Sequence, residues 1–152
     1  MRRKDREVTD IDEIEAIINK SSCFRIGFVD DGEPYIVPVC FGYERNAFYF
    51  HCASEGRKIE IIRKNNSVCF ELDTDVKVVK ADKPCKWASK YRSVMGTGTA
   101  RILGKDEEKK HGLNLIMRQY GGGDFNFSKP ALDSVLIVKV DVHSISAKQA
   151  GY

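Results

Sequence analysis

The segment His51-Cys52-Ala53-Ser54-Glu55-Gly56-Arg57-Lys58 combines residue types suited to binding an anion. In it, a polar turn containing Gly56 leads into a helical pattern that begins with two cations, Arg57 and Lys58. The first N–H groups of a helix lack backbone acceptors and carry partial positive charge, which favours a phosphate at that end. Cations at a helix start oppose the helix dipole, so their presence there suggests a ligand of opposite charge. A phosphate-binding role and the alternative, a solvated helix face, are therefore weighed equally.

His51 is the second candidate for chemistry, because it follows the aromatic run Phe48-Tyr49-Phe50 directly before the polar turn. An imidazole with an ordinary pKa near 6.5 gives or takes a proton close to neutral pH. The alternative is a histidine that only packs within a partly buried strand. His111 and His143 fall at polar positions and are expected at the surface.

The hydrophobic periodicity predicts the elements that position these residues. Helices are expected over about 10–20, 57–64 and 106–120, and strands over 22–29, 35–41, 47–52, 67–79, 91–103 and 134–146, with a loop over 80–90. Pro38 cannot donate a ladder hydrogen bond, so its strand is an edge, carries a bulge or faces a ligand. Gly96 and Gly98 allow their strand to bend. The pattern is mainly β, a small antiparallel barrel with peripheral helices, in one domain over 1–152.

Composition and charge limit the possible partners. The 152 residues are 42% hydrophobic, enough for one core, and no apolar run approaches the roughly 18 residues that a membrane span needs. The amino terminus lacks an apolar signal core, so we expect a cytoplasmic protein. A net charge of +3 is too small to indicate a nucleic-acid partner.

The five cysteines, Cys23, Cys40, Cys52, Cys69 and Cys85, form no Cys-x-x-Cys pair. No His pair lies near them, so we expect no metal site. The first four lie inside apolar runs, where reduced cysteines commonly pack as small apolar residues.

Several short motifs follow one another in an order that resembles the flavin-binding split-barrel superfamily. They are Pro34-Tyr35-Ile36-Val37-Pro38, Phe48-Tyr49-Phe50-His51, Glu55-Gly56-Arg57-Lys58, Val68-Cys69-Phe70-Glu71, and Cys85-Lys86-Trp87 with Lys90-Tyr91-Arg92-Ser93-Val94 and Gly96. Within that superfamily the chain looks most similar to the nitroimidazole-resistance (Nim) branch of the pyridoxamine 5′-phosphate oxidase-like proteins. The resemblance runs from about residue 2 to 149.

The resemblance implies a six-stranded antiparallel split barrel that forms a homodimer and binds FMN between its protomers. Positions matching the family's cofactor contacts are Ile36, Val37, Pro38, Val39, Phe41, Phe50, His51, Ser54, Arg57, Lys58, Arg92 and Ser93, and Trp87 is added as a candidate cap on the flavin or the dimer seam. Arg57 and Lys58 would hold the phosphate, and the strand from Ile36 to Phe41 would follow the isoalloxazine edge. Ser93 stands where the oxidases carry a longer Gln.

The same resemblance implies an oxidoreductase that takes electrons from NAD(P)H or another donor and reduces a small organic acceptor, for example a nitroaromatic. His51 would then lie on the substrate side of the flavin as an acid/base or substrate-positioning residue. The oxidases' carboxyl-terminal Trp and Arg have no counterpart near Tyr152, so vitamin B6 oxidation is not expected. The alternatives are FAD, a deazaflavin or haem as cofactor, and a flavin or haem carrier without turnover.

Overall fold

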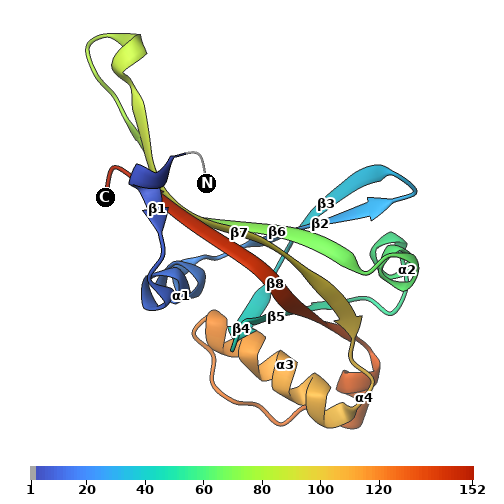
Figure 1. Cartoon of the computed structure of the whole chain (residues 1–152). Helices are drawn as coiled ribbons and strands as arrows, with labels where there is room; N and C mark the ends of the chain where they lie inside the picture. The colour runs from blue at the N-terminus through green and yellow to red at the C-terminus, as the bar shows by residue number, and fades with distance from the viewer. Residues whose placement is uncertain (1–2) are drawn as a thin grey trace.

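The computed structural model describes residues 3–152, so the first two residues of the expected domain lie outside the described part. Most of the chain forms one antiparallel sheet with a few helices around it (Figure 1). The strands are β1 Glu7–Val8, β2 Phe24–Asp30, β3 Glu33–Val39, β4 Phe41–Glu44, β5 Ala47–Cys52, β6 Ser67–Val79, β7 Ala88–Ile102 and β8 Leu136–Ala150. The α-helices are α1 Ile11–Lys20, α2 Arg57–Lys64, α3 Asp106–Gln119 and α4 Lys129–Asp133, and short 3-10 helices cover Lys4–Arg6 and Pro84–Lys86.

A bend at Cys40 brings the two ends of the sheet together. The strand order is β3-β2-β6-β7-β8-β5-β4, with β1 paired to β8, so β3 and β4 stand at opposite ends of the path. They are nevertheless consecutive in the chain, separated by Cys40 alone. The predicted mainly β fold is confirmed, with eight strands instead of six, because the chain divides at Cys40 and β1 adds a short pair. β3 lies at the end of the path, one of the positions predicted for a strand containing Pro38.

Aromatic side chains fill the interior of this barrel. Phe24 stacks on Phe48 with ring centroids 4.5 Å apart, and Phe70 lies 4.9 Å from Phe48. A second cluster lies beneath α3 and includes Tyr49 and Ile137. The helix approaches β4 so closely that a Cβ on Gly42 would lie 2.6 Å from the backbone nitrogen of Ile116, so this position requires glycine.

The predicted bend near Gly98 is confirmed. The pairing of β7 with β8 shifts register between Thr97 and Gly98, as in a β-bulge. A Cβ on Gly98 would lie 2.6 Å from the carbonyl oxygen of Asp141, so the two strands cross here too closely for a side chain.

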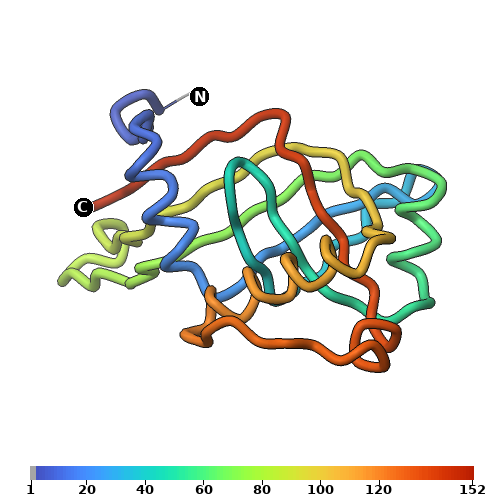
Figure 2. Tube along the Cα trace, turned by 90° about the horizontal axis from the view of Figure 1, so that it is seen from below, coloured from blue at the N-terminus to red at the C-terminus, as the bar shows by residue number. Residues whose placement is uncertain are grey.

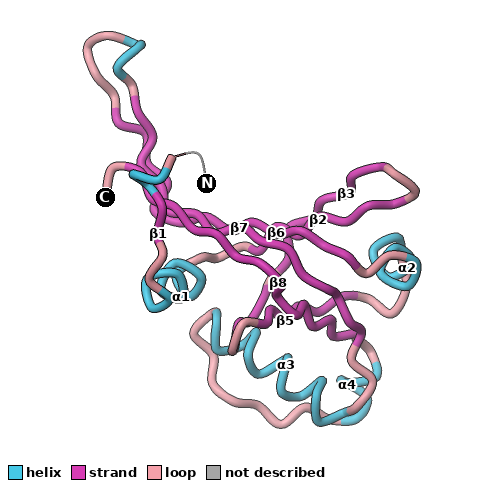
Figure 3. Tube along the Cα trace, viewed as in Figure 1, coloured by secondary structure: helices cyan, strands magenta, loops and turns pink. Residues whose placement is uncertain are grey.

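The ends of β6 and β7 leave the body of the molecule as a long hairpin, which we call the arm and define as residues 76–90 (Figure 3). Strand pairing continues to Val79 and Ala88, so the loop predicted over 80–90 is shorter than expected. At the base of the arm, Asp75 has a φ of 58° and forms ion pairs with Lys20 (2.5 Å) and Arg92 (2.6 Å). Within residues 3–152, no helix has both the length and the apolar character needed to span a bilayer.

Candidate functional site

The start of α2 has the backbone geometry of an anion site. The N-cap, Gly56, has φ 117° and ψ 168°, a conformation that is essentially restricted to glycine. The carbonyl oxygen of Gly56 accepts from the N–H groups of Ile59 (2.9 Å) and Glu60 (3.2 Å), and no side chain caps the helix. The N–H groups of Arg57 and Lys58 therefore precede the first intrahelical donors, as expected at a helix start. A Cβ on Gly56 would meet nothing within 4 Å, so the space beside the turn is open.

The Arg57 side chain lies against the hairpin of β2 and β3. Its Nε donates a hydrogen bond of 2.9 Å to Asp30, and its guanidinium carbon lies 4.7 Å from the ring centroid of Tyr35. A weaker contact of 3.8 Å joins it to Glu33. These contacts position the cation between the start of α2 and β3, the strand that the family resemblance implies follows the flavin edge.

Lys58 supplies a second positive charge with fewer partners. Its ammonium lies 5.8 Å from the ring centroid of Phe50. In the part of the chain that the structure describes, the ion pairs of α2 belong to Arg57 and Lys64, which leaves the Lys58 charge available to a ligand. Burial raises the pKa of the neighbouring Cys52 thiol, and the positive charge of Lys58 opposes that shift.

His51 points outward at the end of β5. The alternation of the strand turns Phe48 and Phe50 into the core, whereas Tyr49 and His51 face the other side. Tyr49 is buried in the cluster beneath α3, but His51 is exposed. Within residues 3–152 the imidazole has no side-chain hydrogen bond and is accessible from solvent.

The residues predicted along β3 divide between the two faces of the strand. Val37 and Val39 pack on the core, whereas Ile36 and Pro38 point outward, and 65% of Ile36 is exposed. The side chain of Phe41 is completely buried, as is that of Phe50. A ligand beside these two phenylalanines would therefore meet their backbone. Ser54 is exposed in the turn before α2.

The remaining predicted residues, Trp87, Arg92 and Ser93, lie at the opposite end of the molecule. Arg92 pairs with Thr74, seven residues beyond the start of β6 at Ser67, which is roughly 23 Å along the strand. Figure 2 shows both chain termini, α1 and the arm at one end and α2 at the other. Arg92 is occupied by Asp75 and by the Tyr152 ring, 4.3 Å away. One chain therefore does not bring the two predicted groups together.

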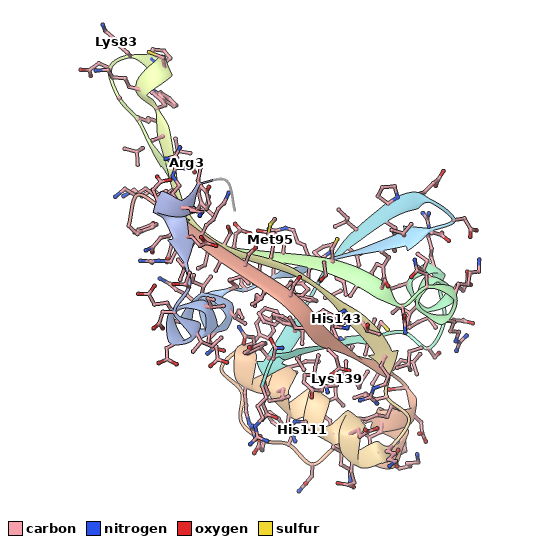
Figure 4. All side chains as sticks on the ribbon, viewed as in Figure 1. Arg3, Lys83, Met95, His111, Lys139 and His143 are labelled. Carbon is pink, nitrogen blue, oxygen red and sulfur yellow. The ribbon has the colours of Figure 1, made fainter. Side chains whose placement is uncertain are left out.

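Trp87 lies on the arm, where 49% of it is exposed. Its indole N–H donates a 2.8 Å hydrogen bond to the Ala81 carbonyl, and Lys80 lies 5.5 Å from the ring centroid. This bond closes the tip of the arm, which also carries Lys83 (Figure 4). About half of the indole therefore remains accessible from solvent.

An apolar groove that the sequence reasoning missed crosses the outer face of the sheet. Its volume is about 580 Å³, and it is lined by Arg25, Gly27, Ile36, Cys69, Phe70, Glu71, Met95, Gly96, Thr97, Ser144, Ile145 and Ser146. Met95 is 54% exposed and points away from the sheet (Figure 4). The available signal was the apolar character of Cys69 and Met95 at positions that alternate with core residues.

The prediction that cysteines pack within the strands is wrong for two of them. Cys40 and Cys69 are exposed, and Cys23 and Cys52 are only partly buried. The reason is strand alternation: Cys69 lies between the buried Val68 and Phe70 and so faces outward. All five cysteines are free thiols in the structure.

Residues 10–149 match the family described as pyridoxamine 5′-phosphate oxidase. The chain belongs to the pyridoxamine 5′-phosphate oxidase-like family. No curated protein matches the sequence. Among solved structures, a candidate 5-nitroimidazole antibiotic resistance protein from Bacteroides thetaiotaomicron is 35% identical, with a TM-score of 0.84, over 94% of this chain and 86% of that one. This neighbour confirms the predicted similarity to nitroimidazole-resistance proteins.

Two more distant structures share the fold. The FAD and heme binding protein from Mycobacterium smegmatis is 16% identical, with a TM-score of 0.86, over 97% of this chain and 74% of that one. The flavocytochrome Anf3 from Azotobacter vinelandii is 18% identical, with a TM-score of 0.85, over 100% of this chain and 72% of that one. These similarities show that the split-barrel fold accompanies flavin and haem binding in other proteins.

Proposed function

We propose that this protein is an FMN-dependent oxidoreductase that acts as a homodimer and reduces a small organic acceptor. The observation that carries the proposal is the start of α2, where Gly56, Arg57 and Lys58 form an anion site next to β3. The flavin phosphate would bind there, and the ring system would extend along the outward side of β3. Family membership and the 35% identical neighbour support a flavin as the ligand.

The residues present fit the phosphate of a flavin. The N–H groups at the helix start and the unpaired Lys58 charge are donors to a dianion, and the open space beside Gly56 admits it. Arg57 is already directed by Asp30 and Tyr35, so little side-chain entropy remains to be lost when it binds a phosphate.

The groove supports the homodimer. Exposed apolar surfaces of this kind commonly mark interaction sites, and Ile36 belongs both to the groove and to β3. A second copy packed on the groove would therefore border the proposed flavin site. Such packing would also let the partner supply the second group of predicted residues, which one chain holds at its far end.

Bound FMN supplies the electron transfer, and the residues of this chain position the reactants and handle protons. His51 is exposed at the end of β5, in the segment that leads into α2, and would deliver a proton to the acceptor from its imidazole as the acceptor is reduced. The Bacteroides neighbour, described as a candidate 5-nitroimidazole antibiotic resistance protein, makes nitroaromatic compounds the first acceptors to test.

The decisive experiment is the absorbance spectrum of the purified chain, reconstituted with FMN, before and after NAD(P)H and then a nitroaromatic acceptor. We expect NAD(P)H to bleach the flavin absorbance and the acceptor to restore it. A protein that binds no FMN in a titration overturns the proposal. Bleaching without acceptor-dependent recovery, or a haem Soret band, instead favours a flavin or haem carrier without turnover.

A further inference from the structure

Two cysteines stand opposite each other where the barrel closes. The ladder between β2 and β3 pairs Phe24 with Val39, so one further step along both strands reaches Cys23 and Cys40. Directly opposed residues in an antiparallel pair have Cα atoms about 4.5–5.5 Å apart. Disulfides form across Cα separations of about 4.4–6.8 Å, so this placement suits a bond between the two sulfurs.

Tyr120 holds this pair of positions in register. Its hydroxyl donates a 3.0 Å hydrogen bond to the carbonyl of Ser22 and accepts a 3.2 Å hydrogen bond from the N–H of Phe41. The residue before Cys23 and the residue after Cys40 are thus fastened to the same oxygen atom. The ladder itself ends at Phe24 and Val39, and the Tyr120 hydroxyl bridges the next two backbone groups, which holds the positions flanking Cys23 and Cys40 near each other.

Both thiols face the same side of the sheet. The neighbours Phe24 and Phe41 point into the core, so strand alternation turns the two cysteines outward. Cys40 is exposed and Cys23 is partly buried. Burial raises the pKa of Tyr120 to about 12, and interactions with Cys40 and then Cys23 add to the shift.

We propose that Cys23 and Cys40 form a reversible redox pair that a peroxide converts into a disulfide. The exposed Cys40 thiolate attacks the peroxide, its oxygen–oxygen bond breaks, and the products are a sulfenic acid and, after protonation, water. The Cys23 sulfur then attacks the Cys40 sulfur, the sulfur–oxygen bond breaks, and the hydroxyl leaves as water with the Cys23 proton. Two thiols lose two electrons in total, and hydrogen peroxide is reduced to two molecules of water.

The disulfide would fasten the start of β2 to the bend between β3 and β4. At that bend the chain passes from β3, at one end of the sheet, to β4, at the other end. The bond would therefore hold the end of β3 in place. The inference does not depend on flavin binding, because the pair and its fastening hydroxyl belong to the chain itself.

The test is peptide mapping of the full chain after peroxide treatment. Fully reduced protein is exposed to hydrogen peroxide, remaining thiols are alkylated, and trypsin cleaves after Lys20, Arg25 and Arg45. The two cysteines then fall on separate peptides, 21–25 and 26–45. We expect these peptides joined at two hydrogen masses below their sum, a loss of two of the five free thiols, and recovery of both with dithiothreitol. Cys40 oxidised to sulfinic or sulfonic acid without the joined peptides overturns the proposal.

Variants distinguish a reaction between Cys23 and Cys40 from oxidation of a single exposed thiol. Cys23→Ser removes the second thiol, so we expect a Cys40 sulfenic acid that dimedone captures in the variant but not in the wild type. Cys85→Ser is the matched control, because Cys85 is exposed on the arm, and it should leave the joined peptides unchanged. Equal dimedone labelling of Cys40 in the wild type and in Cys23→Ser, or peptides joined through Cys85 instead, contradicts the proposal.

Discussion

The Nε atom of Arg57 lies 2.9 Å from a carboxylate oxygen of Asp30, which fastens the first residue of α2 to the end of β2. The guanidinium is about half exposed, so its other nitrogens remain accessible from solvent. Asp30 therefore directs the arginine without enclosing it. A phosphate at the helix start would meet a cation whose orientation is already set.

Replacing this cation tests the phosphate site. We expect Arg57→Ala to weaken FMN binding by about 1.5–3 kcal/mol, or about tenfold to hundredfold, the scale of a lost charge-assisted hydrogen bond. The dissociation constant is measured by quenching of flavin fluorescence. Arg63→Ala, at the exposed far end of the same helix, is the control and should bind normally. Unchanged FMN affinity in the double variant Arg57→Ala and Lys58→Ala would show that the phosphate binds elsewhere.

His51→Ala separates proton transfer from cofactor binding. The imidazole is exposed and has no partner in the described chain, so its loss should leave the fold and the flavin content intact. We expect the rate of acceptor reduction to fall by about two orders of magnitude, a typical contribution of general acid catalysis. Stopped-flow reoxidation at matched flavin occupancy measures it. The control is His143→Ala, since His143 is exposed and hydrogen-bonded to Thr99. Equal rates for His51→Ala and wild type would show that His51 takes no part in the reaction.

A charge in the groove tests the dimer. Met95 is 54% exposed in the groove, so Met95→Glu would bury an unpaired carboxylate if a second copy packs there. We expect sedimentation velocity to show a monomer and FMN affinity to fall together with the loss of the dimer. Ile11→Glu alters a residue that is 57% exposed on α1, outside the groove, and should change neither. A Met95→Glu protein that remains a dimer with full flavin affinity would place the interface on another surface.

Gly56→Ala tests the turn before α2 through the backbone alone. The left-handed φ of 117° strains any L-residue, although a Cβ there would touch nothing within 4 Å. We expect a loss of about 1–3 kcal/mol in the free energy of unfolding, measured with urea, and weaker FMN binding. Gly104 also has open space but no such φ, so Gly104→Ala should be nearly neutral. Similar losses in both variants would show that strain at Gly56 is not the cause.

The base of the arm should give an acid-dependent contribution to stability. The hydrogen bond from Lys20, followed by that from Arg92, lowers the pKa of Asp75 below its usual range. The folded state then binds the Asp75 proton less tightly than the unfolded state, whose pKa is about 3.9. The stabilisation is therefore present above about pH 4 and is lost as the pH falls through the lower, folded value. Asp75→Asn should reduce the melting temperature at pH 7 and converge with wild type in acid; a constant difference down to pH 2 would contradict this.

Local patterns in the sequence predicted the local structure well. The bounds of α2 and β5 agree with the periodicity, since each has a consistent apolar face and ends at a turn residue. The bend at Cys40 was not predictable in the same way. It depends on β3 pairing with β2 while β4 pairs with β5, and no residue near Cys40 encodes those distant partners.

The candidate site was also predicted only in part. The cations at 57 and 58 stand at the helix start as the sequence indicated. The Asp30 partner of Arg57 was not foreseen, because it comes from a hairpin 27 residues earlier in the chain. The separation of Trp87 and Arg92 from α2 depends on the lengths of β6 and β7, which carry them away from the start of β6.

The position of β3 at the end of the sheet has a consequence for how copies of this chain can meet. Pro34 and Pro38 are four residues apart, so their ring nitrogens point to the same side, and the ladder with β2 passes both without a shift of register. Prolines fit such a ladder when their nitrogens face away from the neighbouring strand. The unpaired edge of β3 then offers one backbone N–H, that of Ile36, between two prolines. Such an edge is a poor template for an added strand, which protects the protein from edge-to-edge aggregation and leaves association to the side chains of the sheet face.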